Sequence, residues 1–278
     1  MAAKIQIRDG NPWWVSPDIW VVPGNDPNGN VGSPIAGQSN YLWAKVHNIG
    51  NQLIEGARVN FYWSNPAMGV LRSNSTLVGF GFVDLEVGES KDVLCLTPWT
   101  PIVVNNGHEC VVAEAITPLD PLPTPLQDAF DPPTFDQVAQ KNLQVVVLSP
   151  MMQFMFLPIQ ISASSRLAKS GRITIEIGHL GKEQEQAMLT QLGFERLPRL
   201  KEETVKFGIS RQGGCHSSKE AIAKCNLDFK LEEETSTAVF VHLEQSPKSK
   251  ETGYQLLHLI ERVNGKVVGG NSILIIKK

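Results

Sequence analysis

The sequence predicts an all-β fold made of two tandem antiparallel β-sandwiches, the second of which carries one short helix. Three observations predict it. Apolar and polar side chains alternate along many short segments, turn-forming residues separate those segments, and a helical period appears in one place. The 278 residues and the hydrophobic fraction of 42% are sufficient for two domains with their own cores. We place the domains at 1–149 and 150–278.

The strands of the first half are the most regular. In YLWAKVHN (41–48) and RVNFYW (58–63) every second residue is apolar, which is typical of strands with one face on a core. Asn and Gly residues separate the two runs, as expected at a turn. Many short strands with no helix between them favour an immunoglobulin-like sandwich. Further strands are expected at 18–24, 75–83, 90–99, 107–117 and 141–150.

One connection in the first half is unusual. The segment TPLDPLPTPLQDAFDPPTFDQ (117–137) carries six prolines. Proline cannot donate a hydrogen bond to a strand ladder, so this segment is not sheet interior. Connections of about 20 residues without regular structure are uncommon inside compact domains unless they serve a function. We therefore expect a loop here that interrupts the first domain and takes part in binding.

The second half repeats the strand pattern with one exception. In GKEQEQAMLTQLGF (181–194) apolar residues fall at helical spacing and Gly193 supplies a stop, which predicts a helix near 182–192. Asn264-Gly265 is a strong signal for a hairpin turn. These features predict a second immunoglobulin-like sandwich with a helical crossover. Strands are expected at 151–163, 172–178, 227–233, 238–244, 254–263 and 272–278.

Charge excludes some function classes. The first half holds 7 Lys and Arg against 14 Asp and Glu, whereas the second holds 18 against 14. Neither half is basic enough for nucleic-acid binding. Two solvated surfaces of different sign are the plainer explanation of this asymmetry, and head-to-tail contact between unlike halves of neighbouring copies is the alternative. No apolar run reaches the roughly 18 residues of a membrane span. No apolar leader follows Met1, so we expect a cytoplasmic protein, with a signal-independent extracellular assembly as the alternative.

No motif of a metal site or cofactor site stands out. Asp26, Asn28 and Asn30 have the spacing of the start of a calcium loop, but position twelve is Gly37 in place of glutamate. The cysteines form no zinc-binding pair. Cys95 and Cys110 lie in apolar runs, which indicates buried, reduced structural thiols. We predict no metal and no cofactor. The other two cysteines are Cys215 and Cys225.

No catalytic motif is present either. Cys215 and His216 are adjacent, but adjacent residues of an extended segment point in opposite directions. The remaining histidines are scattered singly, and His47, His242 and His258 alternate within strands as face residues. We predict no catalytic residue. An enzyme with a site between the two sandwiches, using Cys215 or a His–Asp pair formed by the fold, is left as an alternative.

All six tryptophans lie in the first hundred residues. A sandwich core commonly buries one or two, so the others are free to form an aromatic strip on the surface. Such a strip would suit a protein interface or a sugar, whereas core and rim packing is the plainer explanation. The candidate contact residues are Trp13, Trp14, Trp20, Trp99, Pro121, Pro123, Pro125 and Phe130.

The first half also resembles a known family. The residues that carry the resemblance are Val46-x-Asn48-x-Gly50, Val59-x-Phe61-Tyr62, Val78-Gly79, Leu85-x-x-Gly88-Glu89-Ser90 and Val93. Together they are similar to the bacterial cell-adhesion-related, immunoglobulin-like modules called CARDB domains, over roughly residues 18–148. The resemblance implies an immunoglobulin-like sandwich with a binding or spacer role, and it carries over no catalytic residue. The second half is only generically immunoglobulin-like.

These observations predict a non-enzymatic protein-interaction or structural module, in the form of one subunit of a larger homo- or hetero-assembly. The expected partner is a protein or another copy of the chain. A carbohydrate-binding module with an exposed Trp/Tyr strip is the first alternative, and the enzyme described above is the second.

Overall fold

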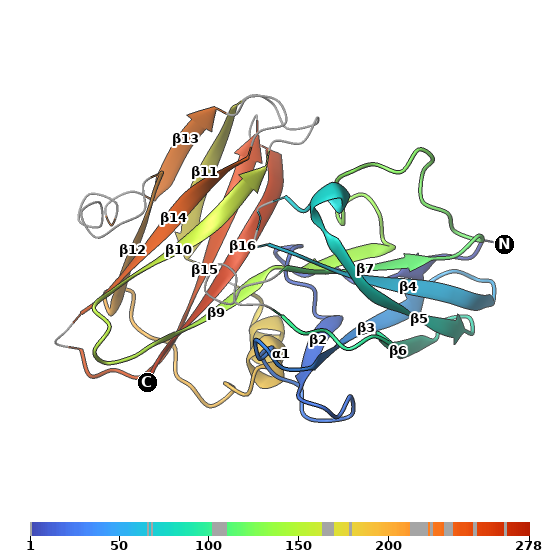
Figure 1. Cartoon of the computed structure of the whole chain (residues 1–278), viewed down its shortest axis with the longest axis horizontal. Coiled ribbons are helices and arrows are strands. Elements are labelled where there is room, and N and C mark those ends of the chain that lie inside the picture. The colour runs from blue at the N-terminus through green and yellow to red at the C-terminus, as the bar shows by residue number, and fades with distance from the viewer. Residues whose placement is uncertain are drawn as a thin grey trace. The chain divides into compact units, whose positions relative to one another are not determined.

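The computed structural model divides the chain into two compact units (Figure 1). Unit 1 comprises Met1–Ser64, Val70–Asn142 and Leu180–Glu195, and unit 2 comprises Asn65–Gly69, Leu143–His179 and Arg196–Lys278. The domain boundary near Pro150 stays a prediction. The described residues are 2–65, 67, 69–101, 110–162, 170–177, 180–211, 222, 225–230, 236–246, 249–263 and 266–278.

Unit 1 contains two antiparallel sheets. In the first, β3 is bordered by β1 and β2 on one side and by β6 on the other. The second has the order β5-β4-β7-β8. A short 3-10 helix, η1 (Arg72–Asn74), precedes β5. The strands are β1 (Ile5–Gln6), β2 (Ile19–Pro23), β3 (Asn40–Asn48), β4 (Ile54–Ser64), β5 (Thr76–Leu85), β6 (Ser90–Leu94), β7 (Cys110–Ile116) and β8 (Val138–Lys141).

The core of unit 1 lies between its two sheets and follows the alternation in the sequence. Leu42, Ala44 and Val46 of β3 are fully buried, as are Val59 and Phe61 of β4. Burying side chains of this size contributes about 2 kcal/mol each. Strand β7 differs because its apolar run is buried on both faces. Its second face carries the structure described in the next section.

Unit 2 also has two sheets, of order β10-β14-β12 and β13-β11-β15-β16-β9, with an aliphatic core that includes residues from both. All pairs are antiparallel except β16 with β9. Strand β15 pairs with β16 up to Val263 opposite Lys266, and the turn residues between them lie outside the described residues. The strands are β9 (Leu143–Leu148), β10 (Phe154–Ser162), β11 (Ser170–Ile177), β12 (Val205–Ser210), β13 (Asn226–Lys230), β14 (Ser236–Gln245), β15 (Gly253–Val263) and β16 (Lys266–Lys277).

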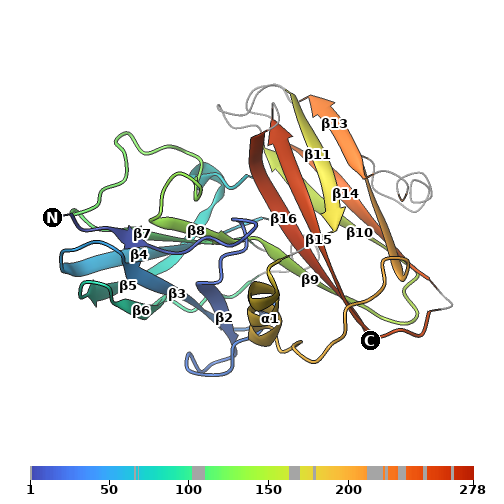
Figure 2. The same cartoon turned by 180° about the vertical axis from the view of Figure 1, so that it is seen from behind.

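The helix α1 (Lys182–Gln191) follows β11 in the chain but packs on unit 1, beside β2 (Figure 2). Buried Lys141 donates from Nζ to the Ile19 carbonyl and to Gln191 Oε1, each at 2.9 Å, and Gln191 Nε2 donates to the Pro17 carbonyl at 3.3 Å. Burial lowers the pKa of Lys141 to about 8. Gly193, with φ of 74°, follows the helix in the left-handed conformation that suits glycine.

The predicted all-β, immunoglobulin-like fold of antiparallel sheets is confirmed, and so is the helix near 182–192. Cys95 and Cys110 are buried and free, as predicted. The strand expected at 141–150, inside the first domain, differs from the prediction. Its residues 143–148 form β9, which pairs in parallel with β16 of unit 2. The last strand of the sheet in unit 1 is instead the short β8.

Candidate functional site

The proline-rich loop 117–137 packs on the second face of β7. Phe130 is buried there against a small cluster that is separate from the main core. The ring of Tyr62 in β4 lies 5.1 Å from the Phe130 ring, centroid to centroid. The loop therefore has a hydrophobic anchor of its own. The cluster consists of Val70, Cys110, Val112, Phe130 and Val138, with Tyr62, Leu122 and Phe135 partly buried around it.

A buried ion pair joins this anchor to the sheet. Arg72 donates from Nη2 to Glu114 Oε1 at 2.5 Å, and its guanidinium lies 4.1 Å from the centroid of the Phe130 ring. Glu114 is 1% exposed. The Tyr62 hydroxyl donates to the other carboxylate oxygen at 3.4 Å. Burial and the nearby Glu114 carboxylate both raise the pKa of Tyr62. Arg72 thus contacts the Glu114 carboxylate and the face of the Phe130 ring. It also contacts the backbone of the loop.

Contacts from residues 70–73 clamp the end of the loop. Arg72 donates from Nε to the Gln127 carbonyl at 3.0 Å and from its amide to the Asp128 carbonyl at 2.7 Å. The Asp128 carboxylate accepts from the amide and the hydroxyl of Ser73, each at 2.9 Å. The Phe130 amide donates to the Val70 carbonyl at 3.0 Å. We call this set the Asp128 clamp.

A second clamp holds the start of the loop. The Asp120 carboxylate accepts from the Ile5 amide at 3.0 Å. The backbone carbonyl of Asp120 accepts from Gln137 Nε2 at 3.3 Å. The Asp120 amide donates to the Thr117 carbonyl, also at 3.3 Å, which closes a turn. We call this set the Asp120 clamp. Both ends of the loop are therefore fixed to parts of unit 1 far away in the sequence.

The six residues between the clamps form an exposed tip, which we define as residues 121–126. Leu122 is partly buried against the Phe130 cluster, and Leu126 is 50% exposed. The tip has no charged residue and three prolines, whose rings restrict the backbone. The result is a short apolar surface held at both ends. Its exposed members are Pro121, Pro123, Thr124, Pro125 and Leu126.

The structure separates the predicted contact residues into two groups. Pro121, Pro123 and Pro125 are exposed on the tip. The side chains of Trp14, Trp99 and Phe130 are buried in packing, and those of Trp13 and Trp20 are half-buried. The binding role expected for these five residues stays a prediction.

Sequence reasoning missed the residues that hold the loop. Arg72, Glu114 and Tyr62 belong to three separate segments, and neither Arg72 nor Glu114 is part of a motif. A signal for Glu114 did exist, because it is a charge inside the apolar run CVVAEAI. A charge in such a position requires a partner. The identity of that partner becomes evident only when residues 72 and 114 are brought together by the fold.

A second buried carboxylate in unit 1 belongs to Asp18. It accepts from Arg8 Nε at 2.9 Å and from Arg8 Nη2 at 2.6 Å, and it lies 2.7 Å from His47 Nε2. His47 Nδ1 lies 2.6 Å from Ser90 Oγ. Burial alone would raise the pKa of Asp18, but the hydrogen bonds from Arg8 and His47 hold it below its ordinary value. The sequence analysis treated His47 only as a strand-face residue.

An acid, a histidine and a serine in contact resemble a catalytic triad, but the arrangement is better explained as structural. The Asp18 carboxylate is already neutralised by Arg8 in a two-point ion pair. His47 and Ser90 are cross-strand neighbours in the β3–β6 ladder. A triad also requires donors placed around a reacting carbonyl. We therefore assign Asp18 to tying the N-terminal segment onto β3.

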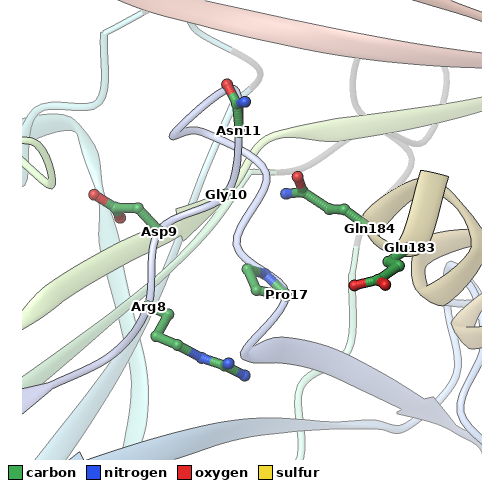
Figure 3. Close-up of a pocket in the computed structure, with 7 residues that line it drawn as sticks. All are labelled: Arg8, Asp9, Gly10, Asn11, Pro17, Glu183 and Gln184. Carbon is green, nitrogen blue, oxygen red and sulfur yellow. The ribbon is translucent and has the colours of Figure 1, made fainter. Parts of the chain in front are cut away.

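The pocket shown in Figure 3 is lined by residues that include Arg8, the ion-pair partner of Asp18. Asp18 itself does not line it. Its volume is about 390 Å³. The Asp9 carboxylate is directed away from the side chains of α1 (Figure 3). Burial, together with Asp136 and Asp131, raises the pKa of Asp9 to about 7. Because the Asp9 carboxylate points away from α1, the groups that line the pocket do not converge on one point (Figure 3). They are Arg8, Asp9, Gly10, Asn11, Pro17, Glu183 and Gln184.

Metal-ligand clusters and membrane-spanning helices are absent from the part of the chain that the structure describes. No three His, Cys, Asp or Glu side chains come together there as a metal ligand set. No helix in it has the length and hydropathy that crossing a membrane requires. Cys215 and His216, which the enzyme alternative invoked, lie outside the described residues.

Comparison with known proteins places the chain among structures of related architecture. No family model and no curated protein matches it. A CARDB domain from Pyrococcus furiosus is similar over 50% of this chain and 86% of that domain, with 16% identity and a TM-score of 0.26. A CARDB domain is therefore among the solved structures to which the chain is similar, in agreement with the resemblance predicted from the motifs of the first half.

Two other solved structures illustrate the range. A putative carbohydrate binding protein from Bacteroides ovatus is similar over 48% of this chain and 35% of its own, with 10% identity and a TM-score of 0.31. The CupB6 tip adhesin from Pseudomonas aeruginosa is similar over 94% and 99%, with 10% identity and a TM-score of 0.25. Identities and TM-scores this low describe architecture and carry no conclusion about function.

Proposed function

We propose that this chain is a non-enzymatic protein-interaction module whose contact surface is the loop tip, residues 121–126. The observation that carries the proposal is the combination of an exposed apolar tip with two clamps. A loop that only connects two strands does not need a buried ion pair beneath it. The cytoplasmic location, the partner and the two-domain division stay predictions.

The clamps have an energetic consequence for binding. Fixing the backbone of one residue costs about 1–2 kcal/mol of conformational entropy. In this loop that cost is met during folding, by the contacts of Arg72, Asp120 and Asp128. The three prolines lower it further, because their φ angles are already restricted. A partner that binds the tip therefore has less ordering to offset, which raises affinity for a given contact area.

The chemistry of the tip indicates the chemistry of its partner. Proline rings and Leu126 present apolar surface with no charge and few N–H donors. Proline-rich segments are recognised by grooves lined with aromatic side chains, which pack against the rings. We therefore expect a protein partner that offers an aromatic, uncharged groove. Another copy of the chain satisfies this description only if it exposes such a groove.

Site-specific photo-crosslinking tests the proposal. A photoreactive residue placed at Leu126 is compared with one at Leu77, which lies on β5 and is exposed to a similar degree. In extract of the source cells, we expect a discrete crosslinked product from position 126 and none from position 77. The product should weaken in an Arg72→Met background, because that change loosens the Asp128 clamp. Equal products from both positions would contradict the proposal.

A second candidate is carbohydrate binding, favoured by one observation. Trp20 and Trp43 are cross-strand neighbours whose rings are parallel within 5°, with centroids 6.1 Å apart. Both are half-buried, and the indole of Trp43 donates to the Pro27 carbonyl at 3.1 Å. Because sugars stack on exposed aromatic faces, a glycan array decides between the two candidates. Binding that is lost in Trp20→Ala but kept in Arg72→Met would favour the carbohydrate module.

A further inference from the structure

Strand β10 forms one edge of the three-stranded sheet β10-β14-β12. It pairs with β14 over nine consecutive residues without a bulge. A regular edge strand presents a row of backbone N–H and C=O groups on its open side, which is a template for pairing with another strand. The open side of β10 therefore requires an explanation.

Pro158 reveals which backbone groups face the open side. It stands opposite Phe240 in an unbroken antiparallel ladder, yet it has no N–H to donate. The ladder must consequently run through the N–H and C=O groups of Leu157 and Ile159. Successive residues of a strand point their backbone N–H and C=O groups to opposite sides. Phe154 and Phe156 therefore point these groups away from β14, as Pro158 does with its C=O.

The C-terminal half of this edge is protected. Pro158 removes one donor, and Ala67 pairs with Gln160 beyond it. The N-terminal half has no such protection within the described residues. Met151 is 93% exposed, Phe154 44% and Phe156 42%. Residues 151–161 contain no charged side chain, although charges and bulges are the usual protection of an edge strand.

We propose that a second copy of this chain pairs with β10, in antiparallel orientation about a two-fold axis at Met155. In this register Phe154 stands opposite Phe156 of the partner subunit, and Phe156 stands opposite the partner's Phe154. Both are hydrogen-bonded pairs, so four N–H···O bonds form. The ladder ends symmetrically where Pro158 meets the partner's Met152.

Three features favour a second copy as the occupant. The register pairs aromatic with aromatic side chains, which is a favourable cross-strand combination. The segment has no charge, so two identical segments do not repel each other. Pro158 of each copy limits the ladder, so the ladder ends in the same way at both ends. A ladder this short gives a weak dimer that depends on concentration, because stable interfaces usually bury far more surface.

Sedimentation equilibrium over roughly 1–300 μM tests the proposal. We expect reversible dimerisation, and the variant Phe156→Pro should reduce the association constant at least tenfold. That variant removes a donor only from the open side, as Pro158 already does, so folding should persist. The control Phe82→Lys replaces an exposed aromatic residue on β5 and should leave association unchanged. A monomer at every concentration, or a dimer insensitive to Phe156→Pro, would overturn the proposal.

A charge exchange tests the register itself and does not depend on Phe156→Pro folding. Phe154→Lys should weaken the dimer, since it leaves a lysine opposite an aromatic ring. The double variant Phe154→Lys/Phe156→Glu places lysine opposite glutamate at both pairs and should restore association in a salt-dependent manner. Failure of the double variant to recover would reject the two-fold register. These results are independent of crosslinking at Leu126.

Discussion

Two glutamates are buried to the same degree in the two units, but their surroundings differ. Glu114 in β7 of unit 1 accepts hydrogen bonds from Arg72 and Tyr62. Glu261 in β15 of unit 2 has no partner at its Oε2 atom. Burial raises the pKa of Glu261 to about 7. The first carboxylate is paired with a cation, whereas burial of the second favours its protonated form.

This difference shows what each carboxylate contributes. A buried ion pair rarely adds net stability compared with an apolar pair, so its retention is often explained by specificity. The Arg72–Glu114 pair fixes the Asp128 clamp, which supports a functional role in unit 1. Glu261 Oε2 has no such partner, and the raised pKa of Glu261 predicts a contribution to the stability of unit 2 that depends on pH.

The largest predicted effect follows from breaking the pair. Arg72→Met leaves Glu114 buried without a cation, and we expect a loss of about 4 kcal/mol in the free energy of unfolding. Urea denaturation measures it. The double variant Arg72→Met/Glu114→Gln should recover more than half of the loss, because the uncompensated charge is gone. A single variant as stable as the wild type would show that the pair is dispensable.

A somewhat smaller effect is expected at the hydrophobic anchor. Phe130→Ala removes a buried ring and the aromatic face beneath Arg72, at a cost of about 3 kcal/mol. Protease cleavage within 121–126 should accelerate in this variant. The matched change Phe82→Ala removes an exposed ring and should alter neither stability nor cleavage by a comparable amount.

The pH dependence of stability distinguishes the two glutamates. Because the folded-state pKa of Glu261 is raised, the folded protein binds the proton more tightly than the unfolded chain does. The contribution of Glu261 to stability is therefore largest below about pH 4.5 and is lost as the pH rises through about 7. Glu261→Gln should be about 3 kcal/mol more stable than the wild type at pH 8 and close to it at pH 4.5.

Thermal unfolding of both proteins across this range measures the difference. Taking the difference between variant and wild type removes the contribution of Asp9, which titrates in the same window. A difference that does not change with pH would show that Glu261 does not titrate as described.

The smallest predicted effect concerns the Asp128 clamp alone. Asp128→Ala removes the acceptor of two hydrogen bonds from Ser73, and because the site is exposed the cost should be about 1 kcal/mol. Asp26→Ala is the matched control, since Asp26 accepts one local bond in an exposed turn. Chemical denaturation of both variants should rank Asp128→Ala as the more destabilised, and the opposite ranking would count against the clamp.

The sequence predicted most elements because their signals are local. Alternation placed β3 and β4, and Gly193 marked the end of α1. Short strands such as β1 and β12 were missed because two to six residues carry little pattern. The pairing of β9 with β16 joins residues 143 and 272, a contact that alternation does not encode.

The candidate site was predicted in outline only. Six prolines identified the loop, whereas the burial of Trp14, Trp99 and Phe130 was not evident from the sequence. The support from Arg72 could not be foreseen, because a surface cation and a buried one look the same in a sequence.

The central claim is that the tip is rigid before any partner binds, and ¹⁵N relaxation tests it most directly. The amides of Leu122, Thr124 and Leu126 report on the tip, with those of β7 as the internal reference. We predict order parameters near the rigid-backbone value of about 0.85 in the wild type, falling below about 0.6 in Arg72→Met. Values below about 0.6 in the wild type would contradict the account, because the clamps would then fail to order the loop.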